Sequence, residues 1–474
     1  MSQIYAGSRG NLVHLGDLDD RVLAKRIAVS INALVRDAES STDGFKSFAS
    51  AISDPVTETK PLRCSFDPQA LSAVLELPWW RRLWTLQEAA LAPWNTAFLG
   101  ALSFDLLDIS RSIIWWRAHA RGELMSSAAR MGLLCLIESY NWSNRGQRWL
   151  IEGHDRLDHL LVGARAFQKS EPKDGVFALL ALLANSPPAL TPDYSRPLSE
   201  ILQNATRCAI SGMRDQSDKF ALDIFQHISH HEGDLERSDV ASWAIRADTE
   251  RDHQVLDAWP LPSQYRIHIP QPYRIVTKDV HMANNVLQVE GYLVDKVLNV
   301  SSVCSVEHLD YGKFVAWLEE TLEIAAQQSF ADLFRTIAVG LCEWDGDYFE
   351  RRDNPGHSGP RSPPTNMLVS TKLSASFPAS PAPAHWEALS QDRWKRMMHR
   401  RFLLTSRGCP GVGPRVTKPG DVVAILHGAS RPYILRPLDN GQYQLVGEAY
   451  VDGLMRDKEI EEYLEPQPVV FALV

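Results

Sequence analysis

The chain has 474 residues, of which 45% are hydrophobic and 23% are charged, and its formal net charge is −9. This length predicts two or three domains, and the composition is that of an ordinary globular protein. The acidic balance lacks the basic footprint of a nucleic-acid-binding protein, and no segment approaches the roughly 20 apolar residues that a membrane helix needs.

The six cysteines are scattered along the chain, and no two of them form a Cys-x-x-Cys pair. A structural zinc site needs closely spaced ligand pairs, so we expect no metal site. Scattered thiols fit a reducing compartment, and the N-terminus has no long apolar run of the kind that marks a signal peptide. These features fit the cytosol or the nucleus, and of the two we expect a cytoplasmic protein.

The first hundred residues alternate helices with strands. NLVHL has the length and apolar content of a buried strand, and Asp19 and Asp20 favour a helix start after it. The predicted elements are a helix tail over 1–9, a strand over 11–15, a helix from 19, an exposed loop over 40–68, a short helix over 69–76 and a strand over 95–100. This order is typical of an α/β module.

One stretch between these elements, LPWWRRLWTLQEAALAPW at 77–94, holds four tryptophans, two adjacent arginines and one glutamate. Pro78 suits the first turn of a helix and Pro93 cannot continue one, so we predict a single helix between them. Its apolar residues recur at intervals of three and four, which places Glu88 beside a wall of indole rings. Arg81 is expected to precede Glu88 along a neighbouring line of the same helix.

Helical spacing dominates the middle of the chain. Residues 104–212 show it almost throughout, and Asp174, after Pro172, marks the start of one helix. The same spacing returns over 312–343. A tract rich in Pro, Ser, Arg and Gly over 347–384 is predicted to be disordered.

Strand-like patterns begin at 236. VASWAI at 240–245 and VLQVEGYLVDKVLNV at 286–300 are predicted strands because they are rich in apolar and β-branched residues. After a predicted helix over 384–401, short strands alternate with turns rich in Gly, Pro and Asn, and GCPGVGP at 408–414 is assigned to a turn. These strands predict a compact β-barrel or a curled meander.

Three separated stretches resemble fungal heterokaryon-incompatibility (HET) domain proteins. The tryptophan stretch matches that family's Trp-x-x-Arg-x-Trp-Thr-x-Gln-Glu motif at Trp79, Arg82, Trp84, Thr85, Gln87 and Glu88. EPKDGVFALLALL at 171–183 and LTPDYSRPLSEI at 190–201 look like a second block of the family. The sequence from RRFLLTS at 400 looks like the β region that often follows it. The blocks occur in the family's order and span most of the chain.

Two strands of that family have no counterpart here. Members begin with an Ala-Leu-Ser-Tyr-x-Trp-Gly strand, followed by a Trp-Ile-Asp-x-x-Cys-Ile-Asn-Gln strand, whereas MSQIY and NLVHLG resemble the segment after them. We therefore expect an N-terminally truncated HET module, either because the true start lies upstream or because the first two strands were lost. A sheet without those strands exposes an edge.

The HET domain is similar to the TIR domain, and NAD-cleaving TIR domains carry a glutamate in a Trp-Cys-x-x-Glu helix. Trp84 and Glu88 have the same spacing. Cleavage of the nicotinamide–ribose bond develops positive charge on the ribose, which a nearby carboxylate stabilises. The resemblance thus implies that Glu88 is a catalytic carboxylate, with Arg81 and Trp84 beside it and NAD as the substrate. The alternative is a structural carboxylate paired with Arg81 or Arg82.

The expected fold class is mixed α+β. The expected parts are a partial TIR-like α/β module at 1–102, a helical region at 103–235, a mixed strand and helix region at 236–346, a disordered linker at 347–384 and a small β-barrel-like domain at 385–474. The resemblance implies a role in fungal nonself recognition, in which fusion of incompatible cells triggers programmed death.

Three functional hypotheses follow from the resemblance. The first is a signalling or interaction protein without turnover, whose partners are proteins of the incompatibility system and which can also self-associate. The second is a NAD glycohydrolase that uses Glu88 and requires an upstream exon or a partner chain to complete its pocket. The third is an enzyme of secondary metabolism that has reused the scaffold. No nucleic acid, membrane, metal or bound cofactor is expected in any of them.

Overall fold

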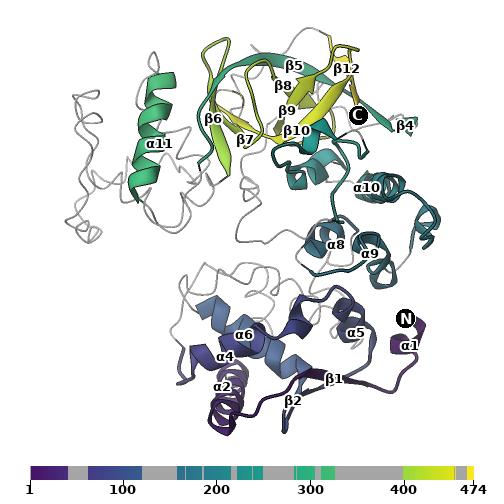
Figure 1. Ribbon diagram of the computed structural model, residues 1–474, viewed down its shortest axis with the longest axis vertical. Helices are drawn as coiled ribbons and strands as arrows, with labels where there is room; N and C mark the ends of the chain where they lie inside the picture. The colour runs from purple at the N-terminus through teal and green to yellow at the C-terminus, as the bar shows by residue number, and fades with distance from the viewer. Residues whose placement is uncertain are drawn as a thin grey trace. The chain divides into compact units, whose positions relative to one another are not determined.

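The computed structural model describes residues 2–40, 62–119, 157–165, 167–183, 186–214, 221–237, 239–248, 282–283, 285–304, 311–325, 399–452, 454 and 467–474. The chain forms two compact units, shown in Figure 1. One unit holds residues 1–212 and 245–256, and the other holds residues 213–244 and 257–474. The expected mixed α+β class, with helices in the middle and strands toward the C-terminus, is confirmed. The expected domain boundaries stay predictions.

The first unit combines a small sheet with short and long helices. Its described elements are α1 Ser2–Ala6, β1 Asn11–Gly16, α2 Arg21–Ser40, α4 Pro68–Leu75, η1 Pro78–Arg81, α5 Thr85–Leu91, β2 Asn95–Leu99, β3 Leu102–Asp105, α6 Leu106–His119, α8 Leu157–Ala164, α9 Asp174–Phe177, η3 Leu180–Leu182, η4 Pro188–Leu190 and α10 Leu198–Arg214. Most of the helices and both strands predicted for this part are present. The predicted loop over 40–68 lies mostly outside the described residues.

The sheet of this unit has three strands in the order β1-β2-β3. β1 and β2 run parallel, side by side in Figure 1, and β3 pairs antiparallel with β2. The strand β3 was not predicted, because its residues Phe104 and Asp105 were assigned to the helical region that begins at 104. In the structure α6 begins at Leu106. The side chain of Asp105, the residue before it, accepts a hydrogen bond from the Leu107 N–H at 2.9 Å. Asp105 therefore ends the strand and caps the helix.

Like α6, the helices α2 and α4 begin where a short acidic side chain can satisfy their first N–H groups. Asp20 Oδ1 accepts from the N–H groups of Val22 and Leu23 at 2.8 and 3.0 Å, which starts α2 as predicted. Asp67 does the same for α4. α2 buries one face. Asp37 of this helix accepts a hydrogen bond from the Trp115 indole of α6 at 2.9 Å.

The prediction of one continuous helix over the tryptophan stretch was wrong. The chain forms the short 3₁₀-helix η1, passes through an extended Arg82 with φ −85° and ψ 133°, and only then forms α5. The extended residue is held by Gln168, whose carbonyl accepts from the Leu83 N–H at 3.0 Å and whose N–H donates to the Arg81 carbonyl. These two backbone bonds replace a helical turn. Arg81 and Glu88 therefore do not share one helix.

The second unit is dominated by a curled sheet. Its described elements are η5 Ala221–His227, η6 Asp234–Glu236, β4 Met282–Ala283, β5 Val286–Val300, α11 Tyr311–Ile324, β6 Arg400–Thr405, β7 Pro410–Pro414, β8 Val422–Leu426, β9 Pro432–Pro437, β10 Tyr443–Glu448, β11 Tyr450–Val451 and β12 Val469–Leu473. Pairings run from β5 to β12, β10, β9, β8 and back to β5, which closes a ring. The far end of β5 continues through β6 and β7 to β11. The ring is consistent with the barrel-like domain predicted here.

The long strand β5 ends where a large excursion of the chain begins. The Cys304 N–H donates to the Arg400 carbonyl at 2.8 Å, and the His399 N–H donates to the Cys304 carbonyl at 2.8 Å. The chain thus leaves the sheet after Cys304 and rejoins it at His399, directly beside Cys304. The predicted disordered tract at 347–384 and most of the predicted helix at 384–401 lie outside the described residues.

Two local predictions in this unit were wrong. VASWAI at 240–245 forms turns rather than a strand, because the Ser242 N–H bonds to the Val474 carbonyl and the Ala244 N–H bonds back to Ala241. GCPGVGP was assigned to a turn, but its last five residues form the buried strand β7. A Cβ at Gly411 would lie 2.6 Å from the Tyr450 carbonyl oxygen, so the glycine permits the close approach of β11.

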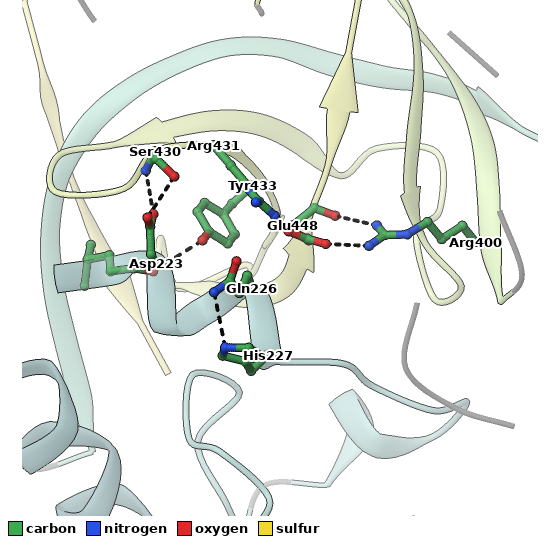
Figure 2. Close-up of polar contacts among 9 residues, drawn as sticks. Asp223, Gln226, His227, Arg400, Ser430, Arg431, Tyr433 and Glu448 are labelled. Atoms are coloured by element: carbon green, nitrogen blue, oxygen red, sulfur yellow. Dashed lines mark hydrogen bonds and ion pairs between the residues drawn. The ribbon is translucent and has the colours of Figure 1, made fainter. Parts of the chain in front are cut away.

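A buried ion cluster links the two parts of this sheet. The Glu448 carboxylate of β10 accepts from Arg400 of β6 at 2.5 Å and from Arg431, which precedes β9, at 2.6 Å (Figure 2). All three side chains are at most 5% exposed. Close by, Asp223 of η5 accepts from the N–H and hydroxyl of Ser430. These contacts fix strands that are distant in sequence to one another.

We predict that Glu448→Gln lowers the free energy of unfolding by about 3–5 kcal/mol, because it leaves two buried guanidinium groups without their shared carboxylate. The matched control is Asp239→Asn in the Arg237–Asp239 pair of the same unit, whose side chains are 57% and 58% exposed. That change should cost less than about 1 kcal/mol. Urea unfolding measures both, and equal small losses would contradict the prediction.

Candidate functional site

Glu88 lies in the first turn of α5, and its carboxylate is half-buried. The Trp79 indole N–H donates to Glu88 Oε2 at 3.2 Å, and the Tyr5 hydroxyl of α1 also hydrogen-bonds to this carboxylate. The Asn11 side chain of β1 donates to the Glu88 backbone carbonyl at 3.1 Å. The end of α5 that carries Glu88 is therefore held against both α1 and the parallel strands.

The donors to Glu88 are neutral groups. Partial burial and the Glu88 carboxylate raise the pKa of Tyr5, while the nearby Arg82 charge acts in the opposite direction. Tyr5 thus stays a protonated donor at neutral pH. Among the described residues, Glu88 has no arginine or lysine within ion-pair distance in the first unit.

Arg81 is not beside Glu88. Its guanidinium pairs with Glu76 at 2.5 Å, and both side chains are about half exposed. Pairing of Glu88 with Arg81 or Arg82, the structural alternative drawn from the sequence, is therefore wrong in its partners. Arg81 is engaged by Glu76, and no ion pair joins Glu88 to Arg82 within the described segments, although the Arg82 charge acts on the neighbouring Tyr5. The carboxylate is held instead by an indole and a phenol.

Trp84 points to a different acid. Its indole N–H donates to Asp174 Oδ2 at 3.0 Å, and the other oxygen of Asp174 accepts from the Tyr194 hydroxyl at 2.6 Å. Asp174 is 6% exposed, whereas Tyr194 is 48% exposed. Burial, followed by the hydrogen bond and charge of Asp174, raises the pKa of Tyr194 far above its usual value, so the phenol remains protonated.

Further bonds surround Asp174. Gln87 of α5 donates to the Ala178 carbonyl at 2.8 Å, one turn after Asp174. Lys173 donates to the Tyr194 carbonyl at 2.6 Å, and the Tyr194 ring packs edge-on against Phe177 at 5.1 Å between centroids. The tryptophan stretch, the EPKDG segment and the PDY turn therefore meet at one buried carboxylate. We call Trp84, Asp174 and Tyr194 the Asp174 cluster.

The contacts of Glu88 and Asp174 support a structural role for these carboxylates more directly than a catalytic one. Each oxygen of Asp174 is engaged by a neutral donor, and the Glu88 carboxylate is engaged by Trp79 and Tyr5. Within the described segments, no set of three His, Cys, Asp or Glu side chains is placed to hold a metal ion. The same segments contain no helix with the length and apolarity to cross a bilayer.

Sequence reasoning placed Glu88, Trp84 and Arg81 in one candidate site, and the structure separates the contacts of these three side chains. It read Asp174 only as a helix start and did not consider Tyr5. The available signal for Asp174 and Tyr194 was the second family block, in which both residues occur. Nothing local in the sequence pointed from Tyr5 to Glu88. The catalytic assignment of Glu88, Arg81 and Trp84 stays a prediction.

Comparison with known proteins adds two matches. Residues 382–468 match the Het-6 beta-barrel domain. A stretch of 74 residues is 40% identical to heterokaryon incompatibility protein 6, OR allele, of Neurospora crassa. This match covers 15% of the present chain and 11% of that protein. No solved structure matches the chain. The resemblance to fungal HET-domain proteins is confirmed by these matches.

We predict that Asp174→Ala lowers the free energy of unfolding of the first unit by about 1–3 kcal/mol, because it leaves the half-buried Trp84 indole N–H and the Tyr194 hydroxyl without their acceptor. Tyr194→Phe should cost about 1 kcal/mol in the wild type and little in the Asp174→Ala background, since the acceptor is then absent. Urea unfolding of the four proteins measures this coupling.

The control is Glu200→Ala in the exposed Arg196–Glu200 pair of α10. Loss of such a pair should cost about 0.5 kcal/mol or less. An Asp174→Ala variant that is no less stable than Glu200→Ala would contradict the proposed role of the Asp174 cluster.

Proposed function

We propose that this chain, which carries a Het-6 beta-barrel domain, acts in fungal heterokaryon incompatibility as a signalling or interaction protein whose output is regulated cell death. The observation that carries the proposal is the Het-6 barrel match over residues 382–468. The 40% identity to an incompatibility protein of Neurospora crassa supports the same role. Three strands of this match, β8, β9 and β10, close a ring with β5 and β12, and partner contacts can be built on this frame.

The contacts of the first unit favour an interaction protein over an enzyme. General acid–base and electrostatic catalysis need a carboxylate that is available to the substrate. Glu88 instead accepts hydrogen bonds from Trp79 and Tyr5, and Asp174 accepts from Trp84 and Tyr194. In this proposal the family motifs hold the unit together. The partners of the chain are other proteins of the incompatibility system, and the chain acts in the cytoplasm.

Expression of the chain in Neurospora crassa strains tests the proposal. Forced heterokaryons between expressing strains and a panel of tester strains of different genotype are scored for growth and for cell death with a vital dye. We expect the wild-type chain to kill fusion cells with a subset of testers and to spare self-fusions. The Asp174→Ala variant should lose the effect through destabilisation, and Glu200→Ala should keep it.

Unchanged heterokaryon growth with every tester strain, despite accumulation of the full-length protein, would refute a role in incompatibility. Equal killing in self-fusions would indicate unspecific toxicity and would also argue against nonself recognition.

A second candidate function is NAD glycohydrolysis at Glu88. The specific observation in its favour is that α5 lies beside the parallel strands β1 and β2, with Asn11 of β1 bonded to the Glu88 backbone. In this reading Glu88 stabilises positive charge on the ribose as the nicotinamide leaves. Tyr5 and Trp79 would have to give way to the substrate, because they occupy the carboxylate in the free protein.

Nicotinamide release from NAD by the purified full-length chain separates the two functions. On the main proposal, wild type and Glu88→Gln give the same background. On the second, wild type releases nicotinamide and Glu88→Gln is slower by about a hundredfold or more. Glu76→Gln is the control, because Glu76 is an exposed glutamate that pairs with Arg81.

A further inference from the structure

His427, the residue that follows β8 in the second unit, carries a buried imidazole. Its side chain is 2% exposed, and neither imidazole nitrogen has a hydrogen-bond partner among the described residues. A buried polar group without a partner is uncommon, and a buried charge costs far more free energy than a buried neutral group. The folded barrel therefore accommodates the neutral imidazole and disfavours the imidazolium.

The charged group that faces this imidazole is a carboxylate of β5. Glu290 Oε2 lies 3.6 Å from His427 Nδ1, which is longer than a hydrogen bond, and the Glu290 side chain is 55% exposed. The Tyr292 ring of β5 lies edge-on to the imidazole, at 5.3 Å between centroids. A hydrated carboxylate offsets only part of the cost of burying an imidazolium. Burial accordingly lowers the pKa of His427, while the Glu290 charge acts in the opposite direction.

The turn at 427–431, between β8 and β9, attaches η5 to the barrel. The Leu222 N–H of η5 donates to the Gly428 carbonyl at 2.8 Å. Asp223 of η5 accepts from the N–H and the hydroxyl of Ser430, as Figure 2 shows. A change in the position of this turn therefore also acts on η5.

Other ionisable groups around the turn have partners of their own within the unit. They are Asp223 of η5, Arg431 of the turn, Tyr433 of β9 and Glu448 of β10. Among the described residues, the charge that acts on the His427 imidazole is that of Glu290.

We propose that His427 is a pH-sensitive switch, which releases the turn at 427–431 and η5 from the barrel when the imidazole takes up a proton. Well above about pH 6.5 the imidazole is neutral in the closed and the released state, so pH has no effect on their balance. Below that value the released state binds more protons than the closed state, and its population grows as the pH falls. The growth ends below the lowered pKa of the buried imidazole. The proposal does not depend on the function proposed above.

Hydrogen–deuterium exchange of the full-length chain between about pH 7.5 and about pH 5.5 tests the switch. After correction for the intrinsic pH dependence of exchange, the amides of η5 and of the turn should lose protection below about pH 6.5, by at most about tenfold per pH unit. His427→Phe and His427→Gln cannot take up the proton, so both should remove this loss. The matched control is His14→Phe, which changes a histidine that is 69% exposed and should keep the wild-type response.

Glu290→Gln distinguishes the imidazole from the carboxylate beside it. If His427 takes up the proton, this variant should lose at least as much protection at about pH 5.5 as the wild type, because the compensating charge is gone. A smaller loss would identify Glu290 as the titrating group and overturn the proposal. Protection that is independent of pH in the wild type, or an equal loss in both His427 variants, would overturn it as well.

Discussion

A single buried carboxylate, Glu448, connects the two parts of the curled sheet. The β5–β12–β10–β9–β8 ring and the β6–β7–β11 extension share the strand β5, and Glu448 adds a second connection by binding Arg400 of β6 and Arg431 before β9. Burial of charged groups costs free energy, and such clusters persist when each charge is paired. The geometry of the cluster therefore depends on the strands meeting in one register, and it penalises other packings of the same strands.

In the first unit a buried carboxylate likewise binds several segments of the chain, but its hydrogen-bond donors are neutral. Asp174 is buried, and the indole of Trp84 and the phenol of Tyr194 each occupy one of its oxygens. The residues come from three separated stretches, so the cluster closes long loops of the chain around one acceptor. Trp84, one of the candidate catalytic residues, is thus also one of the residues that hold the unit together. In both units a buried acid organises segments that are distant in sequence.

Local patterns were sufficient for elements whose cause is local. The helix α2 follows from the cap at Asp20 and its apolar face, and β8 and β9 follow from apolar runs between turns rich in glycine and proline. The break in the tryptophan stretch has a remote cause, because Gln168 holds the extended Arg82. The strand β7 was missed for a related reason, since Gly411 is needed for the approach of Tyr450 and not for a turn. For the site, helix position identified Glu88 and Trp84, but their partners Tyr5 and Asp174 depend on tertiary contacts.

The reciprocal bonds between Cys304 and residues 399 and 400 have a consequence for how such chains diverge. Because the excursion leaves and returns at one point, its length hardly affects the barrel, and a longer loop adds closure entropy only logarithmically. A tight hairpin could replace it without changing any strand pairing in the ring. The chain should therefore tolerate insertions and deletions between Cys304 and His399 that the strands of the ring would not tolerate.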